Sequence, residues 1–224
     1  MEGSVPLIDV RLLFSKTFDA RYMSHLDLMR CFTRAVRHSN LPVWFTEGFN
    51  SHLYITFASP LSLGYESICE TADIRLIGDT LCDGIPEKIN SGLPFGIEVM
   101  NAAPAEMKPS AIAWARYIIE LCGGYDEKLI AEKAASLLNQ RITATKKTKK
   151  GAIKEIVLND RVKSSSVSAL DGCCYWDVIL ANSSENALNP QMLLNALFEQ
   201  LGGETDHILV KRTQLLTESG EIFR

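Results

Sequence analysis

A short proline-containing stretch, residues 102–110, divides the chain into two parts that read alike. Pro104 and Pro109 lie among small residues there, which is typical of a linker. On each side, β-rich segments and helical periodicities follow one another in the order strand, helix, two or more strands, helix, strand. This shared order constrains the fold more than any single motif does, although no residue-level repeat accompanies it.

The first part contains one well-marked helix. Ser24 and Asp27 form a Ser-x-x-acid capping box, and apolar residues then recur at three- and four-residue spacing, so we predict helix 23–38. The side chains expected to pack on its sheet are Leu26, Met29 and Val36. The other elements predicted in this part are strands 5–15, 43–46, 53–58, 69–77 and 96–101 and helix 81–90.

The second part repeats the order. Its predicted helices are 125–140 and 190–201, and its predicted sheet contains 112–121, a hairpin within 142–158, 173–181 and 207–216. Two such β-α-β-β-α-β units match the split βαβ motif. We therefore predict an α+β fold: a tandem of two ferredoxin-like (βαββαβ) units, with antiparallel sheets and helices on one face, as domains 1–104 and 111–224.

The composition is that of an ordinary globular protein, with 46% hydrophobic and 22% charged residues. No apolar run reaches the ~18 residues that a membrane span needs. Residues 1–6 lack the basic and apolar regions of a signal peptide. We expect a cytoplasmic protein that does not contact a membrane.

The six cysteines show no metal-binding spacing. Cys173 and Cys174 are adjacent, whereas Cys31, Cys69, Cys82 and Cys122 are isolated in the sequence. Zinc sites and iron–sulfur clusters need closely spaced cysteines, so we expect no metal in this chain. We expect reduced thiols that pack as small hydrophobic groups.

Basic residues gather in one segment of an acidic chain. The net charge is −4, yet residues 141–163 carry eight lysines and arginines against Glu155 and Asp160, a local +6 that leaves −10 elsewhere. A basic patch on an acidic body can bind nucleic acid, although a solvated hairpin face is the alternative. The residues predicted to contact nucleic acid are Lys146, Lys147, Lys149, Lys150 and Lys154.

A first candidate site lies at the start of helix 23–38. The unpaired amide groups and the dipole of a helix N-terminus attract anions, and Arg21, Ser24 and His25 stand there. We predict phosphate binding by these residues, with His25 as a candidate general acid or base. The alternative is an ordinary helix cap with His25 on the surface.

A second candidate site is the connection between strands 43–46 and 53–58. Gly48 permits a turn, and a carboxylate, an aromatic ring, an amide and an imidazole surround it. Such groups can read a base or bind a small polar ligand, and they can equally form a hydrogen-bonded turn with its ring in the core. The residues concerned are Glu47, Phe49, Asn50 and His52.

Residues 14–67 resemble the radical-SAM-linked protein family. Members of that family are domains of unknown function, found fused to or encoded beside cobalamin-binding radical SAM proteins. The segments that carry the likeness are Ser-His-Leu-Asp-Leu-Met-Arg at 24–30, Glu-Gly-Phe-Asn at 47–50 with His52, and Pro-Leu at 60–61 followed by Leu-Gly at 63–64, with a weaker match at 146–154.

The resemblance implies a radical SAM protein as partner. S-adenosylmethionine, an iron–sulfur cluster and cobalamin are then expected only in that partner, and none in this chain. It also supports a shared site of His25, Glu47 and His52, the candidate catalytic residues. The family usually continues its Gly-Phe-Asn with Pro-His-Pro-Lys, whereas this chain has Ser51-His52-Leu53-Tyr54 and therefore no cation at position 54.

The function that we predict is an accessory substrate-binding module, for structured RNA, that acts with a separate radical SAM enzyme. One alternative is a protein-interaction scaffold for a radical SAM subunit. Another is a metal-independent RNA-processing endonuclease, in which His25 transfers the proton and Arg21 stabilises the phosphate charge. The lack of a cofactor motif disfavours an enzyme.

Overall fold

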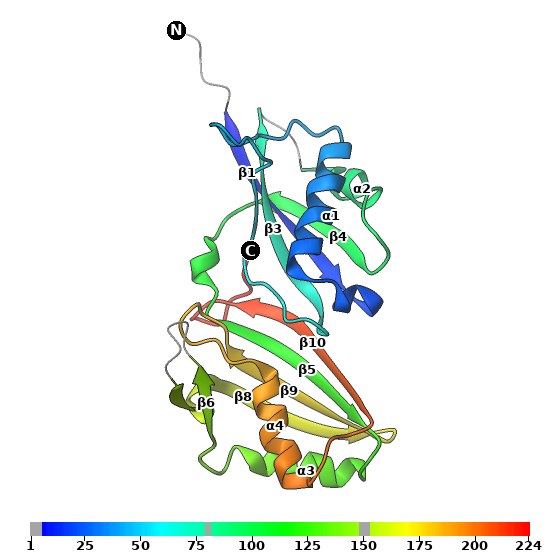
Figure 1. The fold of residues 1–224 in the computed structure, drawn as a ribbon, viewed down its shortest axis with the longest axis vertical. Helices are drawn as coiled ribbons and strands as arrows, with labels where there is room; N and C mark the ends of the chain where they lie inside the picture. The colour runs from blue at the N-terminus through cyan, green and yellow to red at the C-terminus, as the bar shows by residue number, and fades with distance from the viewer. Residues whose placement is uncertain (1–5, 79–81, 148–152) are drawn as a thin grey trace. The chain divides into compact units, whose positions relative to one another are not determined.

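The computed structural model describes residues 6–78, 82–147 and 153–224. The chain forms two compact units, residues 1–109 with Arg224 and residues 110–223. Each unit combines helices with an antiparallel sheet, so the α+β class is confirmed (Figure 1). Among the described residues, no helix is both long and apolar enough to cross a membrane.

The first unit has the strand order β4-β1-β3, with β2 paired to β3, and every pair is antiparallel. The helices α1 and α2 follow β1 and β3 along the chain. The elements are β1 (Leu7–Lys16), the 3-10 helix η1 (Phe18–Tyr22), α1 (His25–His38), β2 (Ile55–Phe57), β3 (Glu66–Ile77), α2 (Ile85–Asn90) and β4 (Ile97–Pro104). A further 3-10 turn, η2 (Pro109–Ala111), contains the point in the chain where the first unit ends and the second begins.

The core of this unit lies between α1 and the sheet. The ring of Phe14 on β1 packs 4.6 Å from that of Phe32 on α1. The buried side of α1 consists of Leu28, Phe32, Ala35 and Val36. Our prediction for this face is therefore right for Val36 and wrong for Leu26, which is 63% exposed. Met29 is half-buried.

The N-cap of α1 is the predicted one, although the helix begins two residues later than the predicted range 23–38. Ser24 is the N-cap, and its hydroxyl oxygen accepts a hydrogen bond from the Asp27 amide at 3.2 Å. This bond satisfies one of the amides that have no partner within the helix. The capping box thus fixes the first helical residue at His25.

The prediction of two full strands over 43–46 and 53–58 is wrong. Only Ile55–Phe57 forms a strand, while Val43 and Phe45 make isolated bridges to Leu76 and Leu53. The chain between them turns back on itself, and the Thr46 amide donates to the His52 carbonyl. A small hairpin loop therefore replaces regular sheet pairing.

The second unit has the strand order β10-β5-β9-β8, again antiparallel. The helices α3 and α4 pack against each other, and α3 also contacts the sheet. The elements are β5 (Trp114–Cys122), α3 (Glu127–Leu137), β6 (Thr143–Lys147), β7 (Ile153–Val157), η3 (Asn159–Arg161), β8 (Val162–Leu170), β9 (Cys173–Ala181), α4 (Pro190–Leu201) and β10 (His207–Leu216).

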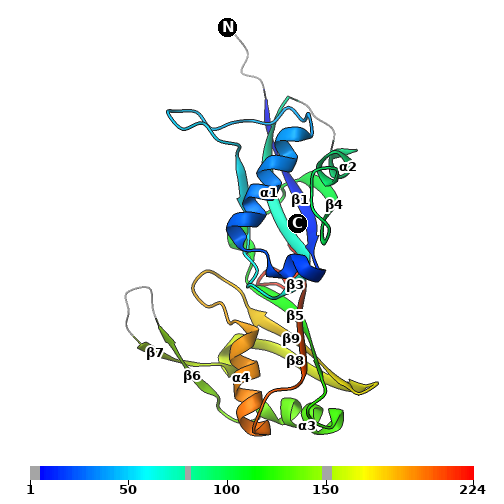
Figure 2. The same cartoon turned by 45° about the vertical axis from the view of Figure 1, so that its right-hand side comes forward.

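The predicted place of segment 142–158 in this sheet is wrong. β6 and β7 pair only with each other, and Figure 2 shows this hairpin standing apart from the sheet. The serine-rich β8, which we did not predict, takes the edge position beside β9. Most of its side chains are exposed, so β8 lacks the apolar alternation by which a half-buried strand is recognised.

The expectation that all cysteines are reduced is wrong for two of them. Cys122, which ends β5, forms a disulfide with Cys173, which begins β9. The adjacent Cys174 points into the core and is fully buried. Burial raises the pKa of its thiol to about 11. The vicinal pair is thus split between the two faces of β9.

Candidate nucleic-acid interface

The outer side of α1 is a basic face. Arg30, Arg34, Arg37 and His38 are all exposed there. Arg34 follows Arg30 by four residues, and Arg37 and His38 follow Arg34 by three and four, so all four lie along one side of the helix. With Leu26, Met29 and Thr33 they line a hollow of about 570 Å³. We call these four basic residues the arginine face.

Two of the arginines are available to an anion. Arg30 is paired with Asp27, with 2.9 Å between the guanidinium and the carboxylate. Among the described residues, Arg34 and Arg37 have no carboxylate partner. The Arg37 guanidinium instead lies 5.4 Å from the centre of the Phe45 ring. This arrangement places a cation beside an aromatic surface at the end of α1.

Residues 44–54, which we call the aromatic loop, adjoin the arginine face at Phe45. Arg75 anchors the base of this loop: its guanidinium lies 5.3 Å from the Trp44 ring and 4.2 Å from the Tyr54 ring. The same guanidinium donates two hydrogen bonds, of 2.6 and 2.9 Å, to Asp9, which raise the pKa of Arg75. The loop is thus held at its base by ring contacts and an ion pair.

The tip of the aromatic loop carries four of the predicted site residues. Glu47, Phe49, Asn50 and His52 are exposed, and Phe49 has no part of its ring covered. His52 Nδ1 lies 3.0 Å from both Thr46 Oγ1 and the Asn50 carbonyl oxygen, so its imidazole is tied to the loop. The structure therefore brings these four together and leaves the Phe49 ring free for a ligand.

The phosphate site predicted at the start of α1 is less favourable than the sequence indicates. The Ser24 hydroxyl donates to Asp27 Oδ2 at 2.7 Å. This bond and that of Arg30 lower the pKa of Asp27, so a negative charge already occupies the helix N-terminus. The His25 ring packs edge-on against Phe57 at 5.4 Å, and Arg21 lies 4.9 Å over Tyr22.

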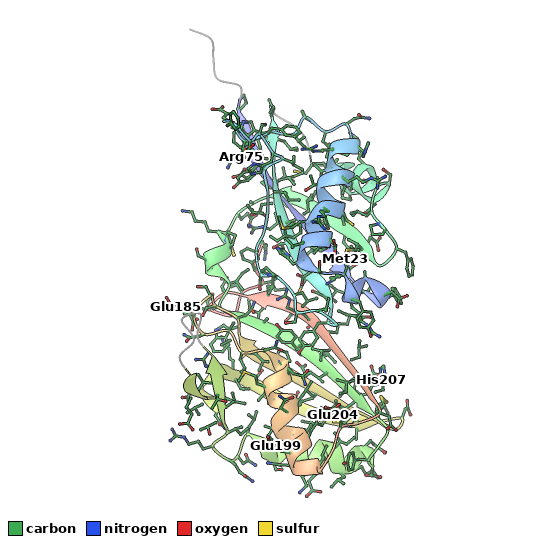
Figure 3. The ribbon with its side chains drawn as sticks, in the orientation of Figure 1. Met23, Arg75, Glu185, Glu199, Glu204 and His207 are labelled. Carbon is green, nitrogen blue, oxygen red and sulfur yellow. A yellow bond between two sulfur atoms is a disulfide. The ribbon has the colours of Figure 1, made fainter. Side chains whose placement is uncertain are left out.

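The structure separates His25 from His52. Arg37, in the last turn of α1, contacts the aromatic loop, and it follows His25 by twelve residues, which is about 18 Å along the helix. Figure 3 shows the two ends of this unit: Met23 precedes α1, and Arg75 anchors the aromatic loop at the other end. The single site that we predicted from His25, Glu47 and His52 is not formed.

The predicted lysines of the basic hairpin are only partly described. The backbones of Lys146 and Lys154 are directly opposite each other on β6 and β7, next to Lys147. Lys149 and Lys150 lie outside the described residues.

Sequence analysis missed the arginine face. Arg30, Arg34 and Arg37 fall in the helix that we predicted, at spacings that share one side, so the signal was present. The net charge of each segment singles out residues 141–163 as the basic region, because Asp27 offsets part of the charge of these arginines. A charge count by helix face, rather than by segment, would have found them.

Solved structures include some that are similar to this chain. No curated protein is significantly similar in sequence to this chain. Among solved structures, the chain is similar to one chain of a Cbf5-Nop10-Gar1 complex, at 11% identity and a TM-score of 0.48, over 93% of this chain and 49% of that one. It thus spans about half the length of that relative.

A second solved structure is an unknown protein from Galdieria sulphuraria, at 11% identity and a TM-score of 0.27, over 92% of this chain and 98% of that one.

A protein-family model also matches the sequence of this chain. The model of a bacterial family matches residues 10–190, which include both the arginine face and the aromatic loop. The chain therefore belongs to the family described as "Uncharacterized protein conserved in bacteria (DUF2344)".

Proposed function

We propose that this protein is an accessory RNA-binding module that acts with a separate radical SAM enzyme. The observation that carries the proposal is the pairing of Arg34 and Arg37, exposed and without carboxylate partners among the described residues, with the aromatic loop beside them. Phosphate contacts position a nucleic acid, and exposed rings stack on its bases.

The geometry favours a single strand. Arg30, Arg34 and Arg37 are spread over about 10 Å of the helix axis, so their long side chains can reach several phosphates of one strand. Phe45 continues this line, and the exposed Phe49 ring offers a stacking surface at the loop tip. Stacking on an aromatic side chain contributes ~1–3 kcal/mol per base with little sequence preference.

The fold supports this proposal indirectly. The strand orders β4-β1-β3-β2 and β10-β5-β9-β8, each with two helices in the β-α-β-β-α-β sequence, support a ferredoxin-like architecture for each unit. β6 and β7 are then an insertion between α3 and β8. The lysines of that insertion supply further charge for RNA in the second unit. Fold alone does not establish an activity, so the arginine face remains the main support.

The partner enzyme rests on the resemblance of residues 14–67 to radical-SAM-linked proteins. In this proposal the partner holds S-adenosylmethionine, the iron–sulfur cluster and cobalamin, while this chain holds the RNA. Co-purification of a radical SAM protein with the tagged chain from its native host supports this part of the proposal. Its absence after crosslinking in cells contradicts it.

The test of RNA binding is a charge-matched pair of variants. We expect Arg34→Ser/Arg37→Ser to weaken binding of a labelled single-stranded RNA, measured by fluorescence anisotropy over a salt series. Because each phosphate contact on a single strand contributes ~0.7 to the slope of log K against log salt, the slope should flatten by ~1.4. The loss should be similar for RNAs of different sequence.

The control is Lys88→Ser/Lys128→Ser, which removes the same charge from exposed positions on α2 and α3. It should bind RNA almost as the parent does. If the parent and the Arg34→Ser/Arg37→Ser variant bind RNA equally well, the arginine face does not contact RNA and is only a solvated surface. The scaffold function would then account better for the protein.

A further inference from the structure

Three potential metal ligands meet at one end of the sheet in the second unit. Cys122 and Cys173 are opposite each other on β5 and β9, with their Cα atoms 4.4 Å apart. Glu120, two residues before Cys122, lies on the same face of β5, and its Oε1 is 3.5 Å from Cys122 Sγ. The two sulfur atoms and a carboxylate oxygen all lie within 4.8 Å of one another.

The register places a histidine on the strand next to these three groups. His207, the first residue of β10, is the partner of Cys122 on the other side of β5. A Cα separation of 4.4 Å marks Cys122 and Cys173 as a non-hydrogen-bonded pair, so the backbone groups of Cys122 face β10. Cys122 and His207 then form a hydrogen-bonded pair about 5.5 Å apart, with side chains on one face. Figure 3 labels the exposed His207.

We propose that, in the reduced protein, Cys122, Cys173, Glu120 and His207 bind one Zn²⁺ ion. Two thiolates, an imidazole and a carboxylate form a donor set that Zn²⁺ takes in tetrahedral sites. With Zn–S of ~2.3 Å and Zn–O of ~2.0 Å, a tetrahedral angle puts sulfur and oxygen about 3.5 Å apart. This is the separation of Cys122 Sγ and Glu120 Oε1.

The surrounding structure suits a cation. Cys122 and Cys173 are partly exposed, so an ion can reach them, while the neighbouring Leu121 and Cys174 are fully buried and hold the two strands. The carboxylate of Asp206, the residue directly before His207, lies against Gly123: its Oδ2 is 2.5 Å from where a Cβ on Gly123 would be. Gly123 therefore cannot be replaced without displacing that carboxylate.

The disulfide is the oxidised form of the same site. A phosphine reductant cleaves the S–S bond by taking up oxygen from water as phosphine oxide, and two thiols result. Binding of Zn²⁺ then displaces the two thiol protons. Since two thiolates of a tetrahedral site lie ~3.8 Å apart, the bonded sulfurs cannot both be ligands, and disulfide and metal exclude each other.

The experiment uses the full chain, stripped of metal with a chelator and reduced with a phosphine in the absence of oxygen. Co²⁺, added as a spectroscopic probe, should give thiolate-to-metal charge-transfer bands and the intense visible bands of a tetrahedral site, at one ion per chain. Zn²⁺ should displace it. The disulfide form of the same chain, which needs no substitution, should give neither band.

Variants identify the ligands. Cys122→Ser and Cys173→Ser should each lower the intensity of the charge-transfer bands at least by half, because each removes one of the two thiolates. Glu120→Gln and His207→Ala should each weaken Zn²⁺ binding by at least ~10-fold, the lower range seen when even an outer-shell partner is lost. Cys31→Ser and Cys69→Ser, which remove thiols of the first unit, should bind like the parent.

Circular dichroism of each variant controls for folding. The proposal is overturned if the reduced parent gives no tetrahedral Co²⁺ spectrum. It is equally overturned if binding survives both cysteine substitutions or is unchanged in His207→Ala. Loss of RNA binding by the arginine-face variant has no bearing on these outcomes, so the two proposals fail separately.

Discussion

Asp27 lies in the first turn of α1, where its carboxylate accepts hydrogen bonds from the Ser24 hydroxyl and the Arg30 guanidinium. The Ser24 bond is the larger cause, and both lower the pKa of Asp27 below its ordinary value of 3.8. A carboxylate whose pKa is lower in the folded state stabilises the protein above the unfolded pKa. That contribution is lost as the pH falls through the lowered folded value.

Asp27→Asn should therefore make the stability less dependent on pH in the acid range. We expect the parent and the variant to differ in urea midpoint near neutral pH and to converge as the pH falls below 3.8. Unfolding followed by circular dichroism at several pH values measures this. Asp19→Asn removes an exposed carboxylate as a control, and a constant difference between Asp27→Asn and the parent at every pH would contradict the account.

Two predictions concern the surroundings of His25: the helix cap formed by Ser24 and Asp27, and a site that His25 shares with His52. The capping box of Ser24 and Asp27 was predictable because it depends on residues three apart in one turn. The site shared with His52 was not, because it depends on the length of α1 and on the path of the chain after it. Those distances follow from tertiary packing rather than from residue type.

At the scale of elements, the sequence of α1 contains two sets of residues, either of which could face the sheet. One contains Leu26, Met29 and Thr33, and the other contains Leu28, Phe32 and Val36. Both have helical spacing, so periodicity predicted the helix and could not choose its face. The choice comes from packing: the Phe32 ring lies 4.6 Å from that of Phe14 in the sheet.

Two matched substitutions test this orientation. Leu28→Ala should lower the free energy of unfolding by ~2–5 kcal/mol, because Leu28 is 5% exposed and its loss leaves a cavity. Leu26→Ala, at a position 63% exposed, should change it by less than ~0.5 kcal/mol. Urea denaturation measures both, and equal losses would mean that the outward side of α1 is not free.

The strands of the second unit were harder to predict than its helices. β6 and β7 contain β-branched residues, so the sequence predicted them as strands of the main sheet. β8 is rich in serine, so the sequence did not predict this edge strand. The signal for β8 was the turn after it. Asp171 and Gly172 both have positive φ, 51° and 80°, as an Asp-Gly hairpin requires, and this turn sets β8 against β9.

At the scale of the whole molecule, the two units differ in how they are held. The first has a core of apolar residues from α1, α2 and its sheet. The second has buried apolar residues of its own and, in addition, the link between Cys122 and Cys173, which are 51 residues apart. A crosslink over such a loop lowers the entropy of the unfolded chain by the equivalent of ~4 kcal/mol.

Reduction in the presence of a chelator should therefore destabilise the second unit selectively. Trp114 and Trp176 belong to that unit and Trp44 to the first, so in Trp44→Phe the tryptophan fluorescence reports the second unit alone. We expect reduction to lower its urea midpoint, by an amount corresponding to as much as ~4 kcal/mol. In the same Trp44→Phe background, Cys122→Ser/Cys173→Ser should reproduce the reduced midpoint and no longer respond to reductant. Because the chelator removes any bound metal, Zn²⁺ added afterwards to the reduced protein should restore part of the lost stability. A fluorescence midpoint that is the same in the oxidised and reduced protein would show that the second unit is held by its core alone.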